Sequence, residues 1–313
     1  MAQFTWVLDA PTGTYKSHAM SKELYQAAVA ETVVVEHCRP VKGYGRKRGE
    51  TVTLVRVSNM TEATSATLSE TDRIPEDTFD LSTQSVTVSE IGRSVPYTSL
   101  SEDLSAFDIE NPIQKKLRQQ MALYLDTLAA TAFKTAQVKY VPTGATAATI
   151  TTNGTAGTSA LTNMNVYHAE EIRDYLYGTL QAPMIGGDYV GIFCTLGLRG
   201  IKRDPTFEEW KKYTDPSAKY NSEIGKLENI RFIETNHSNA FTSAGTGSVL
   251  GTGVVFGDDS VVLAEAMAPE LRAAIPSDFG RSKAVAWYGI LAFKLIWDTG
   301  NAGEARVVHV TTT

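Results

Sequence analysis

One stretch of this sequence restricts the possible folds more than any other, a long run with helical periodicity at residues 112–138. Its apolar side chains fall on one side of a helix: Ile113, Leu117, Met121, Leu125, Leu128 and Ala132. At a rise of 1.5 Å per residue this helix is roughly 40 Å long. Its outer flank carries Lys115, Lys116 and Arg118, a pattern that is more often a solvated face than a binding site.

Strand and helix patterns occur on both sides of this helix. Apolar patterns predict strands at 50–57, 83–97, 189–195, 229–235, 251–263, 283–297 and 305–311, and helices at 15–35 and 161–180. Asp204 and Pro205 open a further helix, because Asp accepts from free backbone N–H groups and Pro has none to leave unpaired. A turn at 298–303 joins the last two strands, which we expect to form an antiparallel pair. The absence of a regular βαβ period indicates an α+β fold.

A polar segment at residues 58–81 separates the first two strands. Arg73 is its one basic residue, against these acidic residues: Glu62, Glu70, Asp72, Glu76, Asp77 and Asp80. A two-stranded excursion of this length cannot build its own core, so it is either disordered or laid on another surface. Its charges repel one another and keep it extended, and it needs a basic partner.

Two other segments have the composition of loops. Residues 142–160 are rich in Thr, Ala and Gly, and Asn153-Gly154 is a candidate turn. Residues 39–48 hold a basic patch among Pro and Gly: Arg39, Lys42, Arg46, Lys47 and Arg48. This patch is either a contact surface or a solvated loop.

The composition bounds the class of protein. The chain has 313 residues and a formal charge of -6, so it buries a full core and does not have the basic surface of a general nucleic-acid binder. Its start lacks a basic and apolar leader and no segment reaches about 18 apolar residues, which argues against secretion and membrane spanning. We expect Cys38 and Cys194 to be buried, reduced thiols.

A search for catalytic or metal-binding patterns finds only weak candidates. His168 and Glu171 have a spacing that a metal site can use, but a third ligand must come from elsewhere. The glycines at 251–257 do not have the spacing of a phosphate-binding loop, and neighbouring carboxylates such as Asp258 and Asp259 point to different faces. We therefore expect no enzyme activity and no cofactor.

Three stretches carry a family resemblance. They are Gly92-Arg93 followed by residues 101–103 and the long helix, residues 198–205 with Arg203-Asp204-Pro205, and residues 222–225 leading to 231–235. Together with the order of elements, they resemble the Hong Kong 97 fold of tailed-phage major capsid proteins, and more narrowly the podophage-type coat proteins. Ser222 stands where that family commonly has glycine, so the turn there differs locally.

The resemblance implies a division of the chain and a set of partners. It implies an N-terminal arm at 1–38, a peripheral domain at 39–57 and 99–160 with a spine helix at 112–138, an extended loop at 58–98, an axial domain at 161–279 and return strands of the peripheral domain at 280–313. The partners are other copies of the chain in hexamers and pentamers, a scaffolding protein, a portal, packaged double-stranded DNA at the inner surface and a possible decoration protein, with no membrane. The chain is then assembled in the host cytoplasm and located in the virion.

Within that frame the charged residues gain expected partners. We expect the acidic loop to dock on the spine helix of an adjacent subunit at Lys115, Lys116 and Arg118, and the basic patch to touch a neighbouring subunit or DNA. An encapsulin-type compartment shares the fold and is the main alternative. An α+β enzyme with an unrecognised site and a fibre or adhesin module are more remote ones.

Overall fold

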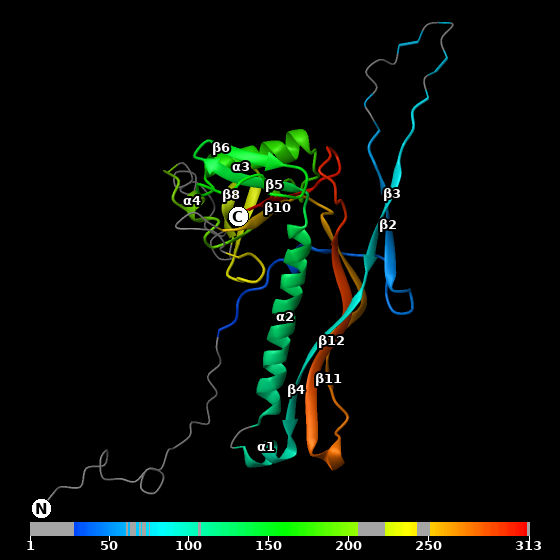
Figure 1. Ribbon diagram of the computed structural model, residues 1–313, viewed down its shortest axis with the longest axis vertical. Helices are drawn as coiled ribbons and strands as arrows, with labels where there is room; N and C mark the ends of the chain where they lie inside the picture. Colours follow the sequence, from blue (N-terminus) through cyan, green and yellow to red (C-terminus); the bar gives the residue numbers. More distant parts are fainter. Residues whose placement is uncertain are drawn as a thin grey trace, which may run out of the picture.

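The computed structural model describes residues 28–60, 62, 67–68, 70, 73–74, 76–105, 108–205, 223–242 and 251–311. The helices are α1 (Ser99–Leu104), α2 (Glu110–Lys134), α3 (Val166–Asp174) and α4 (Arg199–Lys202), and a π-helical turn (Tyr175–Thr179) continues α3. The strands are β1 (Arg39–Pro40), β2 (Thr51–Val57), β3 (Leu81–Thr87), β4 (Ser89–Thr98), β5 (Val138–Gly144), β6 (Ala147–Thr151), β7 (Tyr189–Cys194), β8 (Glu223–Leu227), β9 (Ile230–Thr235), β10 (Gly253–Phe256), β11 (Val261–Ala273), β12 (Ser282–Leu295) and β13 (Val307–Val310). Figure 1 shows a compact body at one end of a long stem, with a hairpin that projects past the body.

The stem consists of α2 packed along a four-stranded sheet of order β1-β11-β12-β4. The long antiparallel pair β11 and β12 runs from Val261 opposite Leu295 to Ala273 opposite Val285. The predicted apolar stripe of α2 lies on this sheet, with Leu117 buried beside Trp287. Each fully buried side chain of this kind contributes about 1.5–3 kcal/mol, so the stripe fixes the helix along the sheet.

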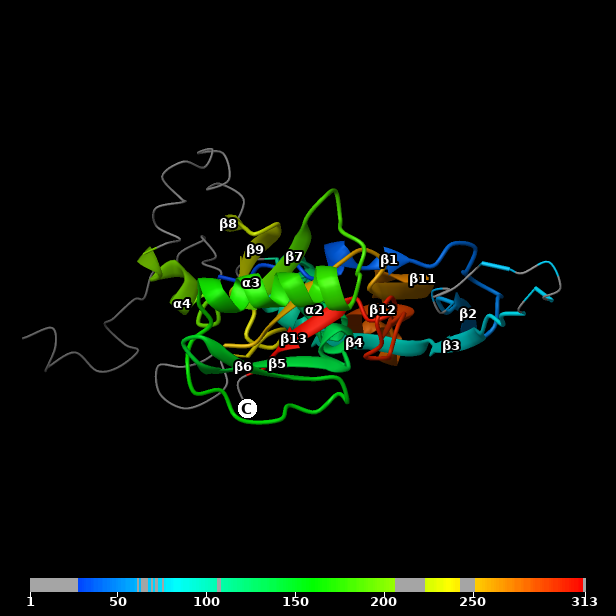
Figure 2. The same cartoon turned by 90° about the horizontal axis from the view of Figure 1, so that it is seen from above.

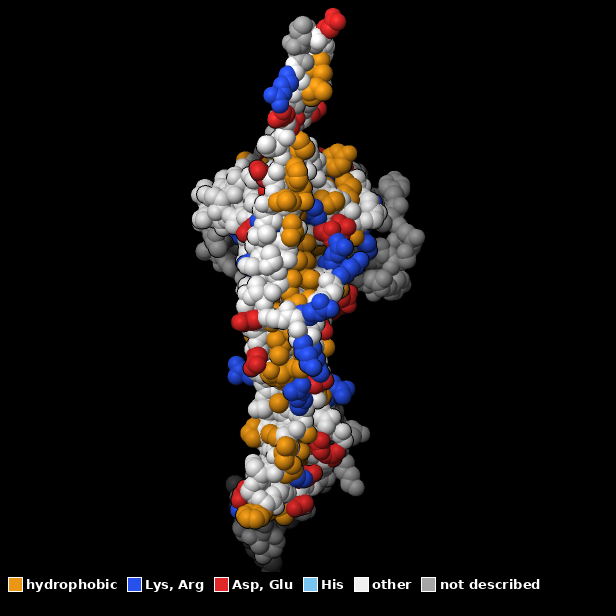
Figure 3. Space-filling view, turned by 90° about the vertical axis from the view of Figure 1, so that its right-hand side faces the viewer, with side chains coloured by type: hydrophobic (Ala, Val, Ile, Leu, Met, Phe, Trp, Pro, Cys, Tyr) orange, Lys and Arg blue, Asp and Glu red, His pale blue; other side chains and the backbone are white. Residues whose placement is uncertain are grey.

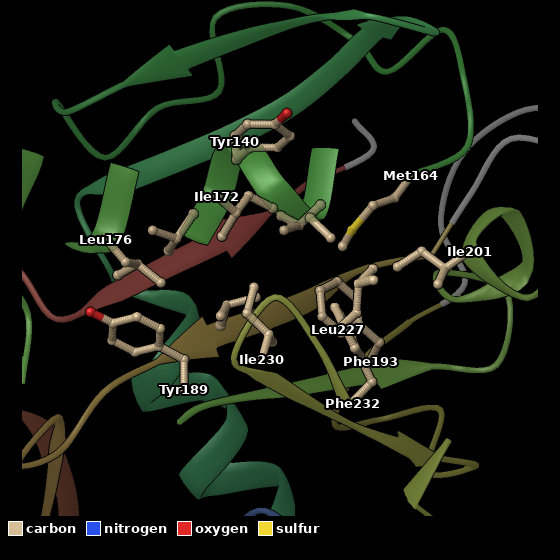
Figure 4. Packing of buried hydrophobic residues seen from close by; sticks show 14 of the residues in the cluster. Tyr140, Met164, Ile172, Leu176, Tyr189, Phe193, Ile201, Leu227, Ile230 and Phe232 are labelled. Carbon is tan, nitrogen blue, oxygen red and sulfur yellow. The ribbon is translucent and has the colours of Figure 1, made fainter. Parts of the chain in front are cut away.

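The body is built on a seven-stranded mixed sheet of order β6-β5-β13-β10-β7-β9-β8. Helix α3 covers one face, where Ile172 and Leu176 pack with Tyr140, Tyr189 and Phe232 in a buried cluster (Figure 4). The C-terminal half of α2 and the segment around Val34 pack on the other face. Figure 2 shows the body from above, with α3 beside the strands of this sheet. The sheet therefore lies between two helical layers and has two separate cores.

Strands β2 and β3 form a two-stranded sheet of their own, the hairpin. The end of its ladder next to Val57 is fixed by Arg56, whose guanidinium lies 2.6 Å from an Asp298 carboxylate oxygen, donates to the Ile296 carbonyl at 3.1 Å and stacks over Trp297. Beyond Val57 the hairpin extends away from the body (Figure 1). The extension matches the polar excursion expected between the first two strands.

Several sequence predictions are confirmed within a few residues, and others are wrong in extent. The spine helix ends at Lys134, four residues before the predicted end at Val138, because Val138 begins β5. The strand predicted at 83–97 is two strands, β3 and β4, which belong to different sheets. The strand predicted at 251–263 is likewise divided into β10 and β11, where Asp259 takes a positive φ of 51°.

Two predicted helices differ from the structure. The helix predicted at 161–180 begins at Val166, because the Asn165 side chain accepts from the His168 N–H and caps it. In the described end of the helix predicted at 15–35, residues 28–34 are not helical and Val35 begins a short 3-10 turn, Val35–His37; the remainder lies outside the described residues. Most of the helix predicted after Pro205 also lies outside them.

The turn predicted at Asn153-Gly154 is not the turn of a hairpin. The chain reverses between Gly144 and Ala147 instead, so part of the predicted loop is the strand pair β5 and β6. Gly154 still has a positive φ of 82° and lies in the segment that follows β6. The Thr- and Ala-rich composition therefore led us to predict a loop where the edge strand β6 forms.

The expectation that the last two strands pair with each other is wrong. Strand β12 lies between β11 and β4, whereas β13 lies between β5 and β10 in the other sheet. The sheets also group the chain differently from the predicted domain limits. Strands β5 and β6 belong to the body although they fall within 99–160, and β11 belongs to the stem although it falls within 161–279.

Candidate subunit interfaces

The far end of the hairpin carries acidic side chains. Those in the described part of the chain are all exposed: Glu62, Glu70, Glu76, Asp77 and Asp80. Arg73 is exposed too and pairs with Glu76. Asp72 lies outside the described residues. Because the other carboxylates have no ion pair within the described residues, the far end keeps a net negative charge.

The hairpin also has an apolar face that the sequence analysis missed. Val57 lies opposite Leu81 in the register, and their side chains and that of Val55 are exposed, by 57%, 61% and 67%. The alternate residues Val52 and Leu54 pack instead against the stem sheet, near Val262 and Ala264 of β11. The break in alternation at Leu54-Val55 was the available signal, because successive side chains of a strand point to opposite faces and Val55 and Val57 therefore lie on the face opposite Val52 and Leu54. Figure 3 shows apolar side chains beside charged ones along this side of the molecule.

The spine helix α2 exposes the predicted basic residues. Lys115, Lys116 and Arg118 are exposed in its first turns, while Leu117 between them is 2% exposed and packs on the stem. Lys116 also lines a hollow of about 420 Å³, which continues along α2 past Tyr124 to His237. The three cations and the acidic hairpin end have opposite charge.

The basic patch at 39–48 divides into two parts. Arg39 belongs to β1, pairs with Asp259 and lies in a shallow pocket with Trp297 and Arg306. The other four residues lie in the loop between β1 and β2 and are exposed, with no ion pair among the described residues: Lys42, Arg46, Lys47 and Arg48. These four loop cations are therefore available to an external partner.

A buried carboxylate fixes the segment that enters the body, and the sequence analysis did not identify it. Asp126 on α2 is fully buried. Its Oδ1 accepts from the backbone N–H groups of Val34 at 2.8 Å and Val33 at 3.1 Å, and its Oδ2 accepts from His237 Nδ1 at 2.9 Å. The Glu31 N–H also donates to the Asn236 side chain at 2.8 Å. These bonds, here called the Asp126 clamp, hold residues 31–34 between α2 and the loop after β9.

The weak metal candidate at His168 and Glu171 is occupied by structural contacts. Glu171 accepts a hydrogen bond from the Tyr140 hydroxyl, and His168 is buried with its ring near those of Tyr140 and Tyr167. Burial lowers the pKa of His168 to about 4, so the ring is neutral at neutral pH. Among the described residues no group of three His, Cys, Asp or Glu is placed to hold a metal ion.

One buried polar pair in the body also resembles a reactive site. Lys139 Nζ donates to the Lys134 carbonyl at 2.7 Å and to His309 Nδ1 at 2.9 Å. Burial lowers the pKa of Lys139 to about 8 and, together with the nearby lysine charges, that of His309 to about 3. Both side chains are buried in the body, and neither lines the hollow beside α2 or the pocket at Arg39. We therefore assign them a structural role.

The remaining sequence expectations concern cysteines and membranes. Cys38 and Cys194 are unlinked and buried, as expected, and burial raises the pKa of the Cys38 thiol to about 12. In the described part of the chain, no helix combines the length and the hydropathy that crossing a bilayer requires.

Comparison with known proteins identifies the fold. No family model and no curated protein sequence matches the chain. The head structure of Helicobacter pylori bacteriophage KHP40 matches with a TM-score of 0.72 at 12% identity, covering 99% of this chain and 98% of that one. The capsid of cyanophage Pam1 matches with 0.67 at 16% identity, covering 100% and 99%, and that of Ralstonia phage GP4 with 0.67 at 13%, covering 99% and 97%. The chain thus has the fold of these phage capsid proteins, and the predicted α+β, Hong Kong 97-like architecture is confirmed.

Proposed function

From this shared fold, we propose that the chain is a major capsid protein that assembles into the icosahedral shell around a phage double-stranded DNA genome. The observation that carries the proposal is a likeness that spans the whole chain and the whole of each capsid protein, rather than one module. The projecting hairpin supports it, because a hairpin with exposed apolar and acidic residues has no use in an isolated copy. The role is structural, without catalysis or cofactor.

The parts of the chain then take the roles of a shell subunit. The stem, with α2, β4, β11 and β12, is the peripheral domain, and the hairpin with residues 58–80 is the extended loop. The body, with α3 and the seven-stranded sheet, is the axial domain that surrounds the centre of each hexamer or pentamer. The Asp126 clamp marks the point where the N-terminal arm leaves the body.

The extended loop docks on the spine helix of an adjacent subunit in this proposal. Its acidic far end has charge opposite to that of Lys115, Lys116 and Arg118. Exposed ion pairs contribute only about 0.2–1 kcal/mol each and are weakened by salt, so they set registry more than affinity. Val55, Val57 and Leu81 add apolar area to the same contact. Because the contact is repeated at every subunit of a closed shell, these small contributions add up to enough free energy to stabilise the assembly.

The loop at Lys42, Arg46, Lys47 and Arg48 contacts a neighbouring subunit or packaged DNA. A few phosphate contacts give a modest, salt-dependent affinity, consistent with a chain that is acidic overall. The test reverses the charge of Arg46 and Lys47 and measures assembly yield and retained genome. Both quantities should fall relative to the wild type, and unchanged values for both would mean that the loop is only solvated.

The further partners belong to the same proposal. A scaffolding protein from a separate gene guides assembly in the host cytoplasm, a portal occupies one vertex, and a decoration protein is an optional addition on the finished virion. The alternative, an encapsulin-type compartment, shares the architecture but encloses protein cargo instead of a genome. Genes for a portal and a terminase beside the gene for this chain would favour the phage assignment.

Sedimentation and negative-stain microscopy of the purified protein provide the deciding experiment. A capsid protein, alone or co-expressed with its scaffold, should give capsomers, closed shells or tubes of capsid width. An α+β enzyme or an adhesin module would remain a small oligomer under every condition. Persistence of a small oligomer with scaffold present would overturn the proposal.

A further inference from the structure

The hairpin formed by β2 and β3 is attached to the rest of the chain at two separate places. At the end where the chain enters and leaves it, Val86 and Val88 pack with Val262 and Ala264 of the stem sheet. At the end next to the projecting segment, Arg56 reaches the residues that follow β12. A two-stranded ribbon is marginally stable by itself, so these two attachments together set the direction in which the hairpin points.

Arg56 is the centre of the second attachment. Its side chain is only 10% exposed, although it carries a full charge. Besides its contacts to the Ile296 carbonyl and the Asp298 carboxylate, its Nε donates to the Ser82 hydroxyl on β3 at 3.2 Å. Its guanidinium also lies 5.3 Å from the centre of the Trp297 ring. The planar guanidinium fork makes all of these contacts at once, which an ammonium group cannot do.

The carboxylate of Glu304 extends this attachment beyond the ladder of the hairpin. It accepts hydrogen bonds from Thr299 at 2.7 Å, from Asn301 at 3.3 Å and from the Ser58 hydroxyl, which belongs to the first residue after β2. These hydrogen bonds, above all the one from Thr299, lower the pKa of Glu304, so the carboxylate is charged at neutral pH. The turn at 298–304 therefore holds the hairpin at the point where the projecting segment begins.

The turn at 298–304 is itself fixed to the body. The Gly303 N–H donates to the Leu180 carbonyl at 2.8 Å. Gly303 has a positive φ of 78°, and a Cβ at this position would lie 3.9 Å from the Asn59 Cβ and still closer to the Asn59 amide. Glycine adopts this backbone conformation without strain and leaves room for the hairpin to approach. Figures 1 and 2 show the turn between the body and the hairpin.

A small change in the direction of the hairpin becomes large at its acidic far end. Glu76 lies ten residues before Val86, a length of at most about 33 Å in extended chain. A tilt of about 10° at the apolar attachment would then move the Glu76 carboxylate by up to about 6 Å. An ion pair needs an N–O distance of about 4 Å or less, so docking of this end requires a fixed direction.

We propose that Arg56, Asp298 and Glu304 form a latch that sets the direction of the hairpin and, through it, the uniform size of the shell. The proposal rests on the shell function proposed above. Contacts between unlike surfaces close into a finite assembly only if the angle from each copy to the next is held within narrow limits, and otherwise they give open tubes. A hairpin attached at both ends of its ladder holds that angle.

Removing the latch tests the proposal in particles assembled with the scaffold. In Arg56→Ala the fraction of particles of wild-type size, measured by negative-stain microscopy, should fall at least fivefold in favour of tubes and other sizes. Destabilisation alone would lower the yield of particles without changing their size. Arg56→Lys should give an intermediate fraction, because it keeps the charge but loses the fork. The matched control is Arg272→Ala on the stem, where the arginine pairs with Glu270 at 2.8 Å and stacks over Tyr288. It should keep the wild-type size.

A disulfide provides the second measurement, because it can replace the latch. The 3.9 Å between the two Cβ positions suits a disulfide, so Asn59→Cys with Gly303→Cys should join on oxidation. With Arg56 present, the oxidised protein should close shells of wild-type size. In the Arg56→Ala background, oxidation should restore the fraction of wild-type size to within twofold of wild type, and reduction should remove the gain. Cys38 and Cys194 are buried and do not compete.

The latch and the capsid assignment fail on different results. If the wild type closes shells, the latch is wrong when Arg56→Ala gives particles of wild-type size. It is also wrong when the disulfide does not form, when the oxidised protein with Arg56 closes no shells, or when the formed disulfide does not restore the size in Arg56→Ala. The capsid assignment stands in each of these cases. If the wild type forms no shells at all, the capsid assignment itself fails and the latch falls with it.

Discussion

Replacing Asp126 with alanine should release residues 33–34 from the body. The Asp126 clamp gives two backbone N–H groups a buried, charged acceptor, and a hydrogen bond of that kind contributes about 1.5–3 kcal/mol. Losing both lowers the free energy of local opening by about 3 kcal/mol, at the lower end of that range. Since every 1.4 kcal/mol is tenfold, the Val33 and Val34 amides should exchange with deuterium about 100-fold faster.

Hydrogen exchange of the unassembled protein, followed by mass spectrometry, measures this change. Asp126→Asn keeps an oxygen acceptor for the two amides and should accelerate exchange by about tenfold, because only the charge is lost. Glu110→Ala is the matched control, since the side chain of this acid at the start of the same helix accepts a hydrogen bond from Gln114 and lies outside the clamp. Exchange in Asp126→Ala within threefold of wild type would show that the clamp does not hold the arm.

Three further predictions concern the shell and its stability. Residues 58–98 contain no lysine, so boiled particles should run as a single band, and covalent ladders with linked peptides from that segment would contradict this. Lys115→Glu with Lys116→Glu should impair assembly, and Glu76→Lys with Asp77→Lys should partly restore it; normal assembly of the first variant at low and high salt would rule out the docking. Burial holds the pKa of His168 near 4, below its unfolded value of 6.5, so the unfolded chain binds more protons between these values and stability should fall as the pH is lowered from 6.5 to 4. His168→Leu should reduce that dependence in thermal melts, and an identical slope in both proteins would refute it.

Periodicity predicted the stem because its cause is local. The stripe through Ile113 and Leu117 needs only one apolar surface beside the helix, and any flat sheet supplies it. The fold class could be predicted from the order of such elements. The pairing of the strands could not, because the turn residues at 298–303 do not specify which sheet receives β13.

Sequence reasoning missed two kinds of residue, a buried acid and exposed apolar side chains. Asp126 was overlooked as one more polar residue of a long helix, yet Ala129, Ala130 and Phe133 follow it at helical spacing and are buried. An acid on a second apolar line of a helix was the signal for a buried carboxylate. The exposed Leu104 and Phe279, at the end of the stem away from the body, have no such signal, since a single sequence does not distinguish a core residue from an exposed apolar one.

The position of β13 imposes an order on folding. This strand inserts between β5 and β10, so the centre of the seven-stranded sheet stays open until residues 307–310 have left the ribosome. Its partners lie about 170 and 50 residues earlier in the chain, and such non-local pairings form slowly. A nascent chain consequently has no finished body with which to join others. In the proposed shell, a chain without this strand would therefore lack the finished body that a neighbouring subunit has to contact.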